Sequence, residues 1–167
     1  TTRGRVFRLK AYDVPEASRI AKGQALVNFL QLSPGESVSA TYATDDIEKS
    51  KFLLMVTNKG TVKKTEISEF ENIRNSGLIA IKLKDGDNLQ WVHPTTGNDE
   101  IVLVSKQGQA IRFSEKNVRA MGRTASGVRG IRLKGQDHVV GMGVVPSSVA
   151  KKFGELELLV LMSHGYG

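Results

Sequence analysis

The stretch KGTVKK, residues 59–64, decides the fold because two other segments repeat its pattern. RGRVFR spans residues 3–8, and QGQAIR spans residues 107–112. Each segment has a glycine, a small or β-branched residue two positions later and a cation four positions later. The three segments recur at spacings of roughly 50 residues, which is typical of repeat proteins. A further SHGYG, residues 163–167, resembles the start of a fourth unit.

The remainder of each unit repeats as well. A second glycine precedes a β-rich stretch, a turn with glycine follows, and then come another predicted strand and a short apolar run. Apolar runs of this length, bounded by turns, are typical of strands buried on both faces. Unit by unit, these predicted strands are Leu26–Leu32, Ser37–Ala43 and Phe52–Val56; Leu78–Leu83, Asn88–His93 and Ile101–Val104; and Val128–Leu133, His138–Val145 and Leu158–Met162.

Units of this length with about four strands each predict an all-β propeller of four-stranded blades. The whole chain, 1–167, is then part of one propeller domain with units 1–56, 57–104 and 105–162 and the start of another at 163–167. Since propellers have at least about four blades, we expect these three units to belong to a larger ring. Residues 67–73 and 115–121 fit either a helical turn or a loop.

Composition limits the possible classes of protein. The chain has 40% hydrophobic and 25% charged residues, which fits a globular protein and not a disordered one. It has no cysteine, which excludes disulfides and cysteine-based zinc sites. No apolar run approaches the roughly 20 residues that span a bilayer, and the N-terminal residues show no signal pattern. These features favour a cytoplasmic location.

Charge follows the repeat. The net charge is +7, and the first half of each unit is basic while the second half is acidic. Residues 1–32, 58–84 and 105–134 carry +4, +3 and +7, whereas residues 33–57, 85–104 and 135–167 carry −2, −4 and −1. Equivalent segments of stacked blades occupy equivalent places in a ring, so we expect a curved band of cations.

A band of cations suits the phosphate backbone of duplex DNA, because lysine and arginine displace condensed counterions whatever the base sequence. Lys82 and Lys84 alternate with Ile81 and Leu83, which predicts cations on one face of a strand. Many phosphate contacts offset the roughly 1–6 kcal/mol needed to bend a short duplex. For any single cation the alternative is a charged strand edge that prevents sheet aggregation.

Several motifs, in order along the chain, resemble the second to fifth blades of the C-terminal domain in the DNA gyrase A family, a type IIA topoisomerase family. The resemblance covers nearly the whole chain. The motifs are RGRVFRLK (3–10) with VPEASR (14–19), KGTVKKT (59–65) with SEF (68–70), VRAMGR (118–123) with GVRGIRLK (127–134), and HGYG (164–167).

The resemblance implies a six-bladed β-pinwheel in which neighbouring blades exchange strands. It also implies that duplex DNA wraps around the basic rim, which serves ATP-dependent negative supercoiling. Charge patterning and the resemblance together predict the DNA-binding residues Arg5, Arg8, Lys10, Arg19, Lys22, Lys63, Lys64, Arg74, Arg112, Arg119, Arg123, Arg129 and Arg132.

One motif of the family has no match here. Gyrase carries a seven-residue basic box, Gln-Arg-Arg-Gly-Gly-Lys-Gly, in its first blade, and we expect that blade to precede Thr1. A box that is absent or degenerate, as in the related topoisomerase IV, would instead favour relaxation and decatenation. The resemblance implies the rest of the gyrase A protein and the gyrase B protein as partners, and no membrane. ATP and Mg²⁺ then act elsewhere in the enzyme, and this segment needs no cofactor.

No residue pattern predicts catalysis or metal binding in this chain. Tyr12, Tyr42 and Tyr166 lack the surroundings of a nucleophile, and the three histidines lack ligand spacing. Residues 122–130 are rich in glycine and arginine but lack the Gly-Lys-Ser/Thr ending of a P-loop. A protein-interaction propeller remains an alternative, favoured if Arg8, Lys64 and Arg112 occupy unrelated surfaces. A propeller hydrolase is the weakest alternative.

Overall fold

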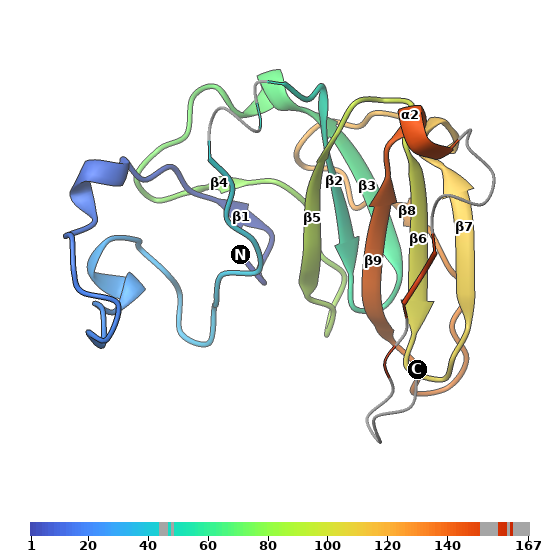
Figure 1. Ribbon diagram of the computed structural model, residues 1–167, viewed down its shortest axis with the longest axis horizontal. Coiled ribbons are helices and arrows are strands. Elements are labelled where there is room, and N and C mark those ends of the chain that lie inside the picture. Colours follow the sequence, from blue (N-terminus) through green and yellow to red (C-terminus); the bar gives the residue numbers. More distant parts are fainter. Residues whose placement is uncertain (44–46, 48, 151–156, 160, 162–167) are drawn as a thin grey trace.

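The computed structural model describes residues 1–43, 47, 49–150, 157–159 and 161. Within them nine strands form three antiparallel sheets, which confirms the predicted all-β class (Figure 1). The strands are β1 (Arg5–Val6), β2 (Phe52–Thr57), β3 (Thr61–Glu66), β4 (Leu78–Ile79), β5 (Leu89–Thr95), β6 (Glu100–Ser105), β7 (Ala110–Ser114), β8 (Val128–Arg129) and β9 (Val139–Val145).

Short turns of helix lie outside the sheets. Residues 67–73 and 115–121, for which the sequence left two possibilities, each begin with a 3₁₀ turn. The turns are η1 (Ala11–Asp13), η2 (Leu26–Asn28), η3 (Ile67–Phe70), η4 (Glu115–Asn117) and the α-helical turn α2 (Ser147–Ala150). No helix in the described part of the chain combines the length and the apolar character needed to cross a membrane.

Neighbouring units exchange strands, as the resemblance implies. The four-stranded sheet has the order β5-β2-β3-β8, and its outermost strand, β8, comes from the next unit along the chain. In the same way β4 of the second unit pairs with β1 of the first. The third sheet has the order β7-β6-β9. Each exchanged strand therefore ties two successive units together.

Glycines permit these junctions. Gly60 has a φ of +78°, and a Cβ added there would lie 2.7 Å from Cγ2 of Ile131. The equivalent Gly4 has a φ of +73°, and its Cβ would lie 2.6 Å from Cγ2 of Ile81. The carbonyl of each glycine accepts the amides of two residues of the incoming segment. Only glycine provides both the left-handed conformation and the space.

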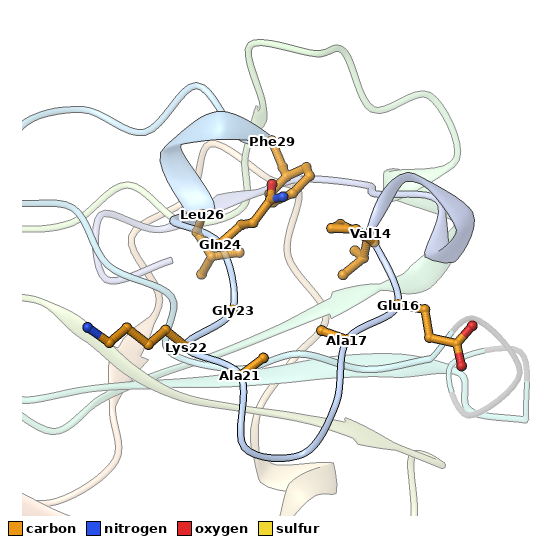
Figure 2. Close-up of a pocket in the computed structure, with 10 residues that line it drawn as sticks. Val14, Glu16, Ala17, Ala21, Lys22, Gly23, Gln24, Leu26 and Phe29 are labelled. Carbon is orange, nitrogen blue, oxygen red and sulfur yellow. The ribbon is translucent and has the colours of Figure 1, made fainter.

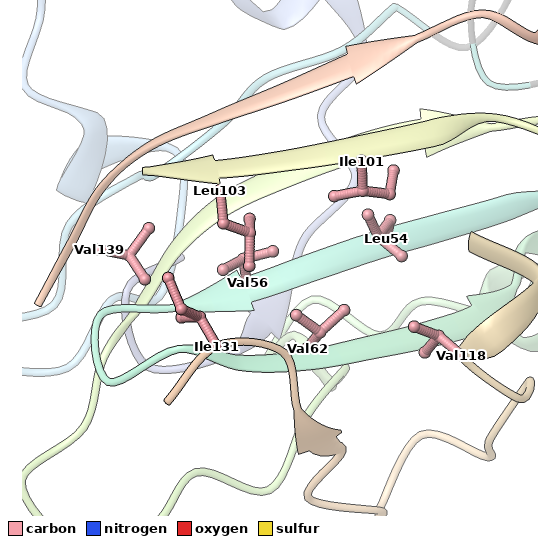
Figure 3. Close-up of a cluster of buried hydrophobic side chains, with 8 residues drawn as sticks. All are labelled: Leu54, Val56, Val62, Ile101, Leu103, Val118, Ile131 and Val139. Atoms are coloured by element: carbon pink, nitrogen blue, oxygen red, sulfur yellow. The ribbon is translucent and has the colours of Figure 1, made fainter. Parts of the chain in front are cut away.

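Strand β2 is buried on both faces, as its apolar run predicts. Leu54 and Val56 pack in one cluster with Val62, Ile101 and Ile131 of the next junction (Figure 3). Alternate residues of the same strand, Leu53 and Met55, pack in a second cluster with Phe70 and Ile81. The two clusters lie on opposite sides of one blade, so β2 serves both junctions.

The sheets begin one strand earlier than the units defined on the sequence. β2 falls in the sequence unit 1–56, yet it pairs with β3 and β5 of unit 57–104. The apolar run therefore opens each blade. Among the described residues, no strand equivalent to β2 or β6 precedes β1.

Several predicted strands are absent or shorter in the structure. Of Leu78–Leu83 and Val128–Leu133, only the two-residue strands β4 and β8 form. Ser37–Ala43 forms no strand; its counterparts β5 and β9 pair with β2 and β6, and no equivalent strand lies beside Ser37–Ala43 among the described residues. Leu26–Leu32 contains the turn η2 instead of a strand. In the predicted strand Leu158–Met162, residues 158, 159 and 161 have no regular structure. Residues 160 and 162–167 lie outside the described residues, so the end of that strand and the predicted fourth unit stay predictions.

Candidate nucleic-acid interface

The two segments that begin with the exchanged strands β4 and β8, residues 77–84 and 127–134, carry exposed cations at equivalent positions. Lys82 and Lys84 lie five and seven residues after Gly77, and Arg132 and Lys134 lie five and seven residues after Gly127. All four are exposed, while the preceding Ile81 and Ile131 are 2% and 6% exposed. This is the alternation that the sequence predicts for Lys82 and Lys84. It directs apolar side chains into the junctions and cations to solvent.

Further cations extend this surface around the second junction. Arg129 is exposed on β8, and Arg119 and Arg74 are exposed in the loops that lead into the outer strands. The guanidinium of Arg123 is half-buried, and its Nε lies 3.5 Å from Oε2 of Glu69. We define the outer basic segments as residues 77–84 and 119–134. The second of them carries five cations and no carboxylate.

A backbone hydrogen bond joins the two outer basic segments, and two further contacts hold the second segment to β3. The amide of Lys82 donates to the carbonyl of Ala125 at 3.1 Å. The amide of Met121 donates to the carbonyl of Lys64 at 2.8 Å, beside a β-bridge between Lys64 and Ala120. The cations of successive units therefore lie on adjoining pieces of backbone.

Carboxylates of the acidic halves turn inward and cap loops. Asp87 is buried, and its Oδ1 accepts the amides of Lys59 and Asn88 at 3.0 and 2.9 Å. Asp137 is its counterpart and accepts the amides of Gln107 and His138 at 3.0 and 2.9 Å. These acids serve the turns between strands, so they do not neutralise the outer cations.

Lys63 and Lys64 were expected on the outer rim, and this expectation is wrong. Lys63 is 0% exposed, and its Nζ donates to the carbonyls of Ala80 and Arg123, both at 2.6 Å. Burial lowers the pKa of Lys63 to about 8. Lys64 is 5% exposed, and its Nζ donates to the carbonyl of Glu115 at 2.8 Å. The next unit covers β3, so neither ammonium reaches solvent.

The guanidinium of Arg5 is also bonded to other protein groups. Its guanidinium forms an ion pair with buried Glu36 and donates to the carbonyls of Gln31 and Ser76, both at 2.9 Å. The hydrogen bonds from Arg5 lower the pKa of Glu36 to about 2. A guanidinium with these partners holds the first unit together and has little capacity left for a phosphate.

The remaining predicted contacts are exposed. Arg8, Lys10, Arg19 and Lys22 lie on the first unit, and the Nζ of Lys10 lies 5.3 Å from the ring centre of Tyr12. On β7, Arg112 is exposed, with its Nε 3.3 Å from Oε2 of Glu100. Arg8, Lys64 and Arg112 have the same position in their units, but Lys64 is buried. This position therefore forms no continuous band.

The first unit also contains a cavity of about 370 Å³, formed within one loop (Figure 2). Val14, Leu26 and Phe29 line it, and Lys22 lies at its border. The counterparts of Val14 in the next two units, Phe70 and Val118, are buried in the junction clusters. The cavity is therefore the open side of a junction and has no convergent polar groups.

The family model described as "DNA gyrase C-terminal domain, beta-propeller" matches residues 1–45, 51–96 and 99–146. The chain belongs to the DNA gyrase C-terminal domain family. It is 44% identical over 167 residues to the DNA gyrase A protein of Salmonella typhimurium, covering 100% of this chain and 18% of that protein. It is 49% identical over 130 residues to the DNA gyrase A protein of Clostridium acetobutylicum, covering 78% of this chain and 16% of that protein.

Solved structures agree with this assignment. The C-terminal domain of DNA topoisomerase IV has a TM-score of 0.78 at 31% identity, covering 87% of this chain and 46% of that chain. The DNA gyrase A C-terminal domain has a TM-score of 0.68 at 26% identity, covering 84% and 44%. The fold is thus the predicted propeller of the gyrase family. The chain spans less than a fifth of the length of the two gyrase A proteins and less than half of these two solved domains.

The acidic residues, histidines and tyrosines considered for chemistry can be placed where the structure describes them. Within them no group of three histidine, cysteine or acidic side chains could hold a metal ion. The hydroxyl of Tyr42 donates to the carbonyl of Val92, and Tyr12 is 76% exposed. Residues 44–46 and 48, which include an acidic cluster, and Tyr166 lie outside the described part.

The predicted contact residues omitted Lys82, Lys84 and Lys134. Their signal was present, since each alternates with an inward-facing apolar residue in its outer segment. The prediction favoured the cation four residues after the opening glycine, because that residue recurs in all three units. Strand exchange buries Lys64, the cation at that position in the second unit, and leaves Lys82 and Lys84 exposed.

Proposed function

We propose that this domain binds duplex DNA without sequence specificity, along the outer basic segments, and bends it. The observation that carries the proposal is the equivalence of Lys82 and Lys84 with Arg132 and Lys134. These cations recur at equivalent positions just after the exchanged strands β4 and β8, and none has an ion-pair partner among the described residues. Cations placed in this way match a phosphate backbone that follows the curve of the blades.

The composition of the segments supports duplex DNA over single-stranded nucleic acid. Residues 119–134 combine five cations with no carboxylate, and aromatic residues make up only 6% of the chain. Stacking on unpaired bases needs aromatic side chains among the cations. None lies in residues 77–84 or 119–134. Cations without aromatic neighbours support contact with the phosphates of duplex DNA, independent of base sequence.

The wider role follows from the relatives. We infer that the domain wraps DNA for a DNA gyrase, which uses ATP and a second type of polypeptide to introduce negative supercoils. The names of the relatives at 44% and 49% identity support gyrase over topoisomerase IV. On this proposal the domain itself is non-catalytic, and it works in the bacterial cytoplasm on the nucleoid.

Binding measured against salt tests the central claim. A fluorescein-labelled duplex of about 30 base pairs is titrated with the chain at several salt concentrations. The logarithm of the association constant should fall linearly with the logarithm of the salt concentration, by about 0.9 per phosphate neutralised. A flat salt dependence, or preference for a single strand of the same length, would refute the proposal.

A further inference from the structure

Lys63 is a buried cation at a position where the other units have apolar residues. It lies three residues after Gly60, and its counterparts three residues after Gly4 and Gly108 are Phe7 and Ile111. Phe7 packs against Gly77, where a Cβ would lie 2.7 Å from its ring. Lys63 packs against Gly127 in the equivalent place, where a Cβ added to Gly127 would lie 3.1 Å from the Cβ of Lys63. An apolar side chain therefore suffices for packing at this point.

A lysine at such a position has a cost that an apolar residue avoids. The ammonium loses its hydration on burial, and the lowered pKa of Lys63 reflects that loss. No carboxylate within ion-pair distance compensates it among the described residues. Packing and stability alone do not explain the residue.

The hydrogen bonds of Lys63 join all three units at one point. Its Nζ donates to the carbonyl of Ala80, whose amide donates to the carbonyl of Gly4 at 2.8 Å. The same Nζ donates to the carbonyl of Arg123. Ala80 belongs to one outer basic segment and Arg123 to the other, and Lys82 and Ala125 are bonded two residues farther on.

We propose that Lys63 is a positioning residue for DNA bending, which fixes the two outer basic segments relative to each other without touching DNA. The inference rests on the proposed function, since the segments it fixes are the proposed DNA contacts. A change in their relative placement alters the path of the duplex between units. It leaves the number of neutralised phosphates unchanged.

The test compares two buried-lysine variants of the full chain, K63M and K64M. Lys64 is the matched control, because its ammonium donates to Glu115 and not to either outer basic segment. Three quantities are measured for each protein: the salt slope of DNA binding, the energy transfer between dyes on the two ends of a duplex at saturation, and the exchange rate of the Lys82 amide without DNA.

K63M should keep the salt slope of the unmodified chain, and it should unfold at the same or a higher temperature because the buried ammonium is removed. It should nevertheless lose end-to-end energy transfer. Its Lys82 amide should exchange about tenfold faster or more, because the bond to Ala125 opens locally, while the Gly130 amide, bonded to Gly60, stays protected. K64M should leave the energy transfer unchanged.

Other outcomes overturn the inference. A salt slope that falls by about 0.9 in K63M would mean that Lys63 contacts a phosphate itself. An equal loss of energy transfer in both variants would mean general loss of packing. Unchanged transfer and exchange in K63M, with normal binding, would refute the role of Lys63 alone. Failure of the unmodified chain to bind DNA would instead refute the proposed function.

Discussion

The double variant K82A/K84A should weaken DNA binding and its salt dependence without unfolding the domain. Both lysines are exposed, and neither has an ion-pair partner among the described residues. Their replacement should therefore change the free energy of unfolding by no more than about 0.5 kcal/mol. The backbone of the segment keeps its bonds to Gly4 and Ala125, since these involve main-chain atoms. Any effect on DNA binding then reports lost phosphate contacts.

The size of the effect follows from counterion release. Two lost contacts lower the slope of log K against log salt by about 1.8. Between 50 and 200 mM salt the unmodified chain should accordingly lose about twelvefold more affinity than K82A/K84A. Fluorescence anisotropy with a labelled duplex at four or more salt concentrations measures both slopes. R132A/K134A, which changes the equivalent positions of the next unit, should give the same decrease.

A charge-matched control separates local contact from overall charge. Lys49 and Lys51 are exposed and precede β2, outside the outer basic segments. K49A/K51A removes the same two charges and should keep the slope of the unmodified chain. If K49A/K51A lowers the slope as much as K82A/K84A does, net charge explains binding, and the outer basic segments are not its location.

Three further predictions concern buried or paired charges. Burial lowers the pKa of Lys63 from 10.5 to about 8, so between these pH values the unfolded chain binds more protons than the folded chain. The free energy of unfolding should therefore rise by up to about 3 kcal/mol from pH 8 to 10.5, relative to K63M, in denaturant titrations. Since Arg5 lowers the pKa of Glu36 from 4.5 to about 2, the stability from this pair is present above pH 4.5 and is lost as the pH falls towards 2; E36Q should abolish that part of the acid transition. E69Q frees the guanidinium of Arg123 and should tighten DNA binding a few-fold at low salt in anisotropy titrations.

Periodicity explains how much of the fold the sequence could predict. The repeating glycines and apolar runs predicted the blade architecture, and β2 is buried on both faces as its composition requires. The residue at which each blade begins was not predictable in the same way. A repeat has no intrinsic beginning, and only hydrogen bonding reveals that Phe52–Thr57 pairs with the strands that follow it. Ser37–Ala43 has the composition of a strand, but no strand among the described residues pairs with it, and a strand depends on its partner.

The exposure of the cations in the candidate site was harder to predict from the sequence. Arg8, Lys64 and Arg112 are equivalent in the sequence, and local chemistry treats them alike. Their burial differs because η4 and β8 cover β3, whereas no strand among the described residues pairs with the outer edge of β7. Equivalent positions in a repeat thus have equivalent surroundings only where the neighbouring units are also equivalent. The cations that follow the exchanged strands avoid this limit, because β4 and β8 each lie at the edge of the sheet in which they pair. Lys82 and Arg132 therefore locate the proposed DNA path better than the cation four residues after each opening glycine.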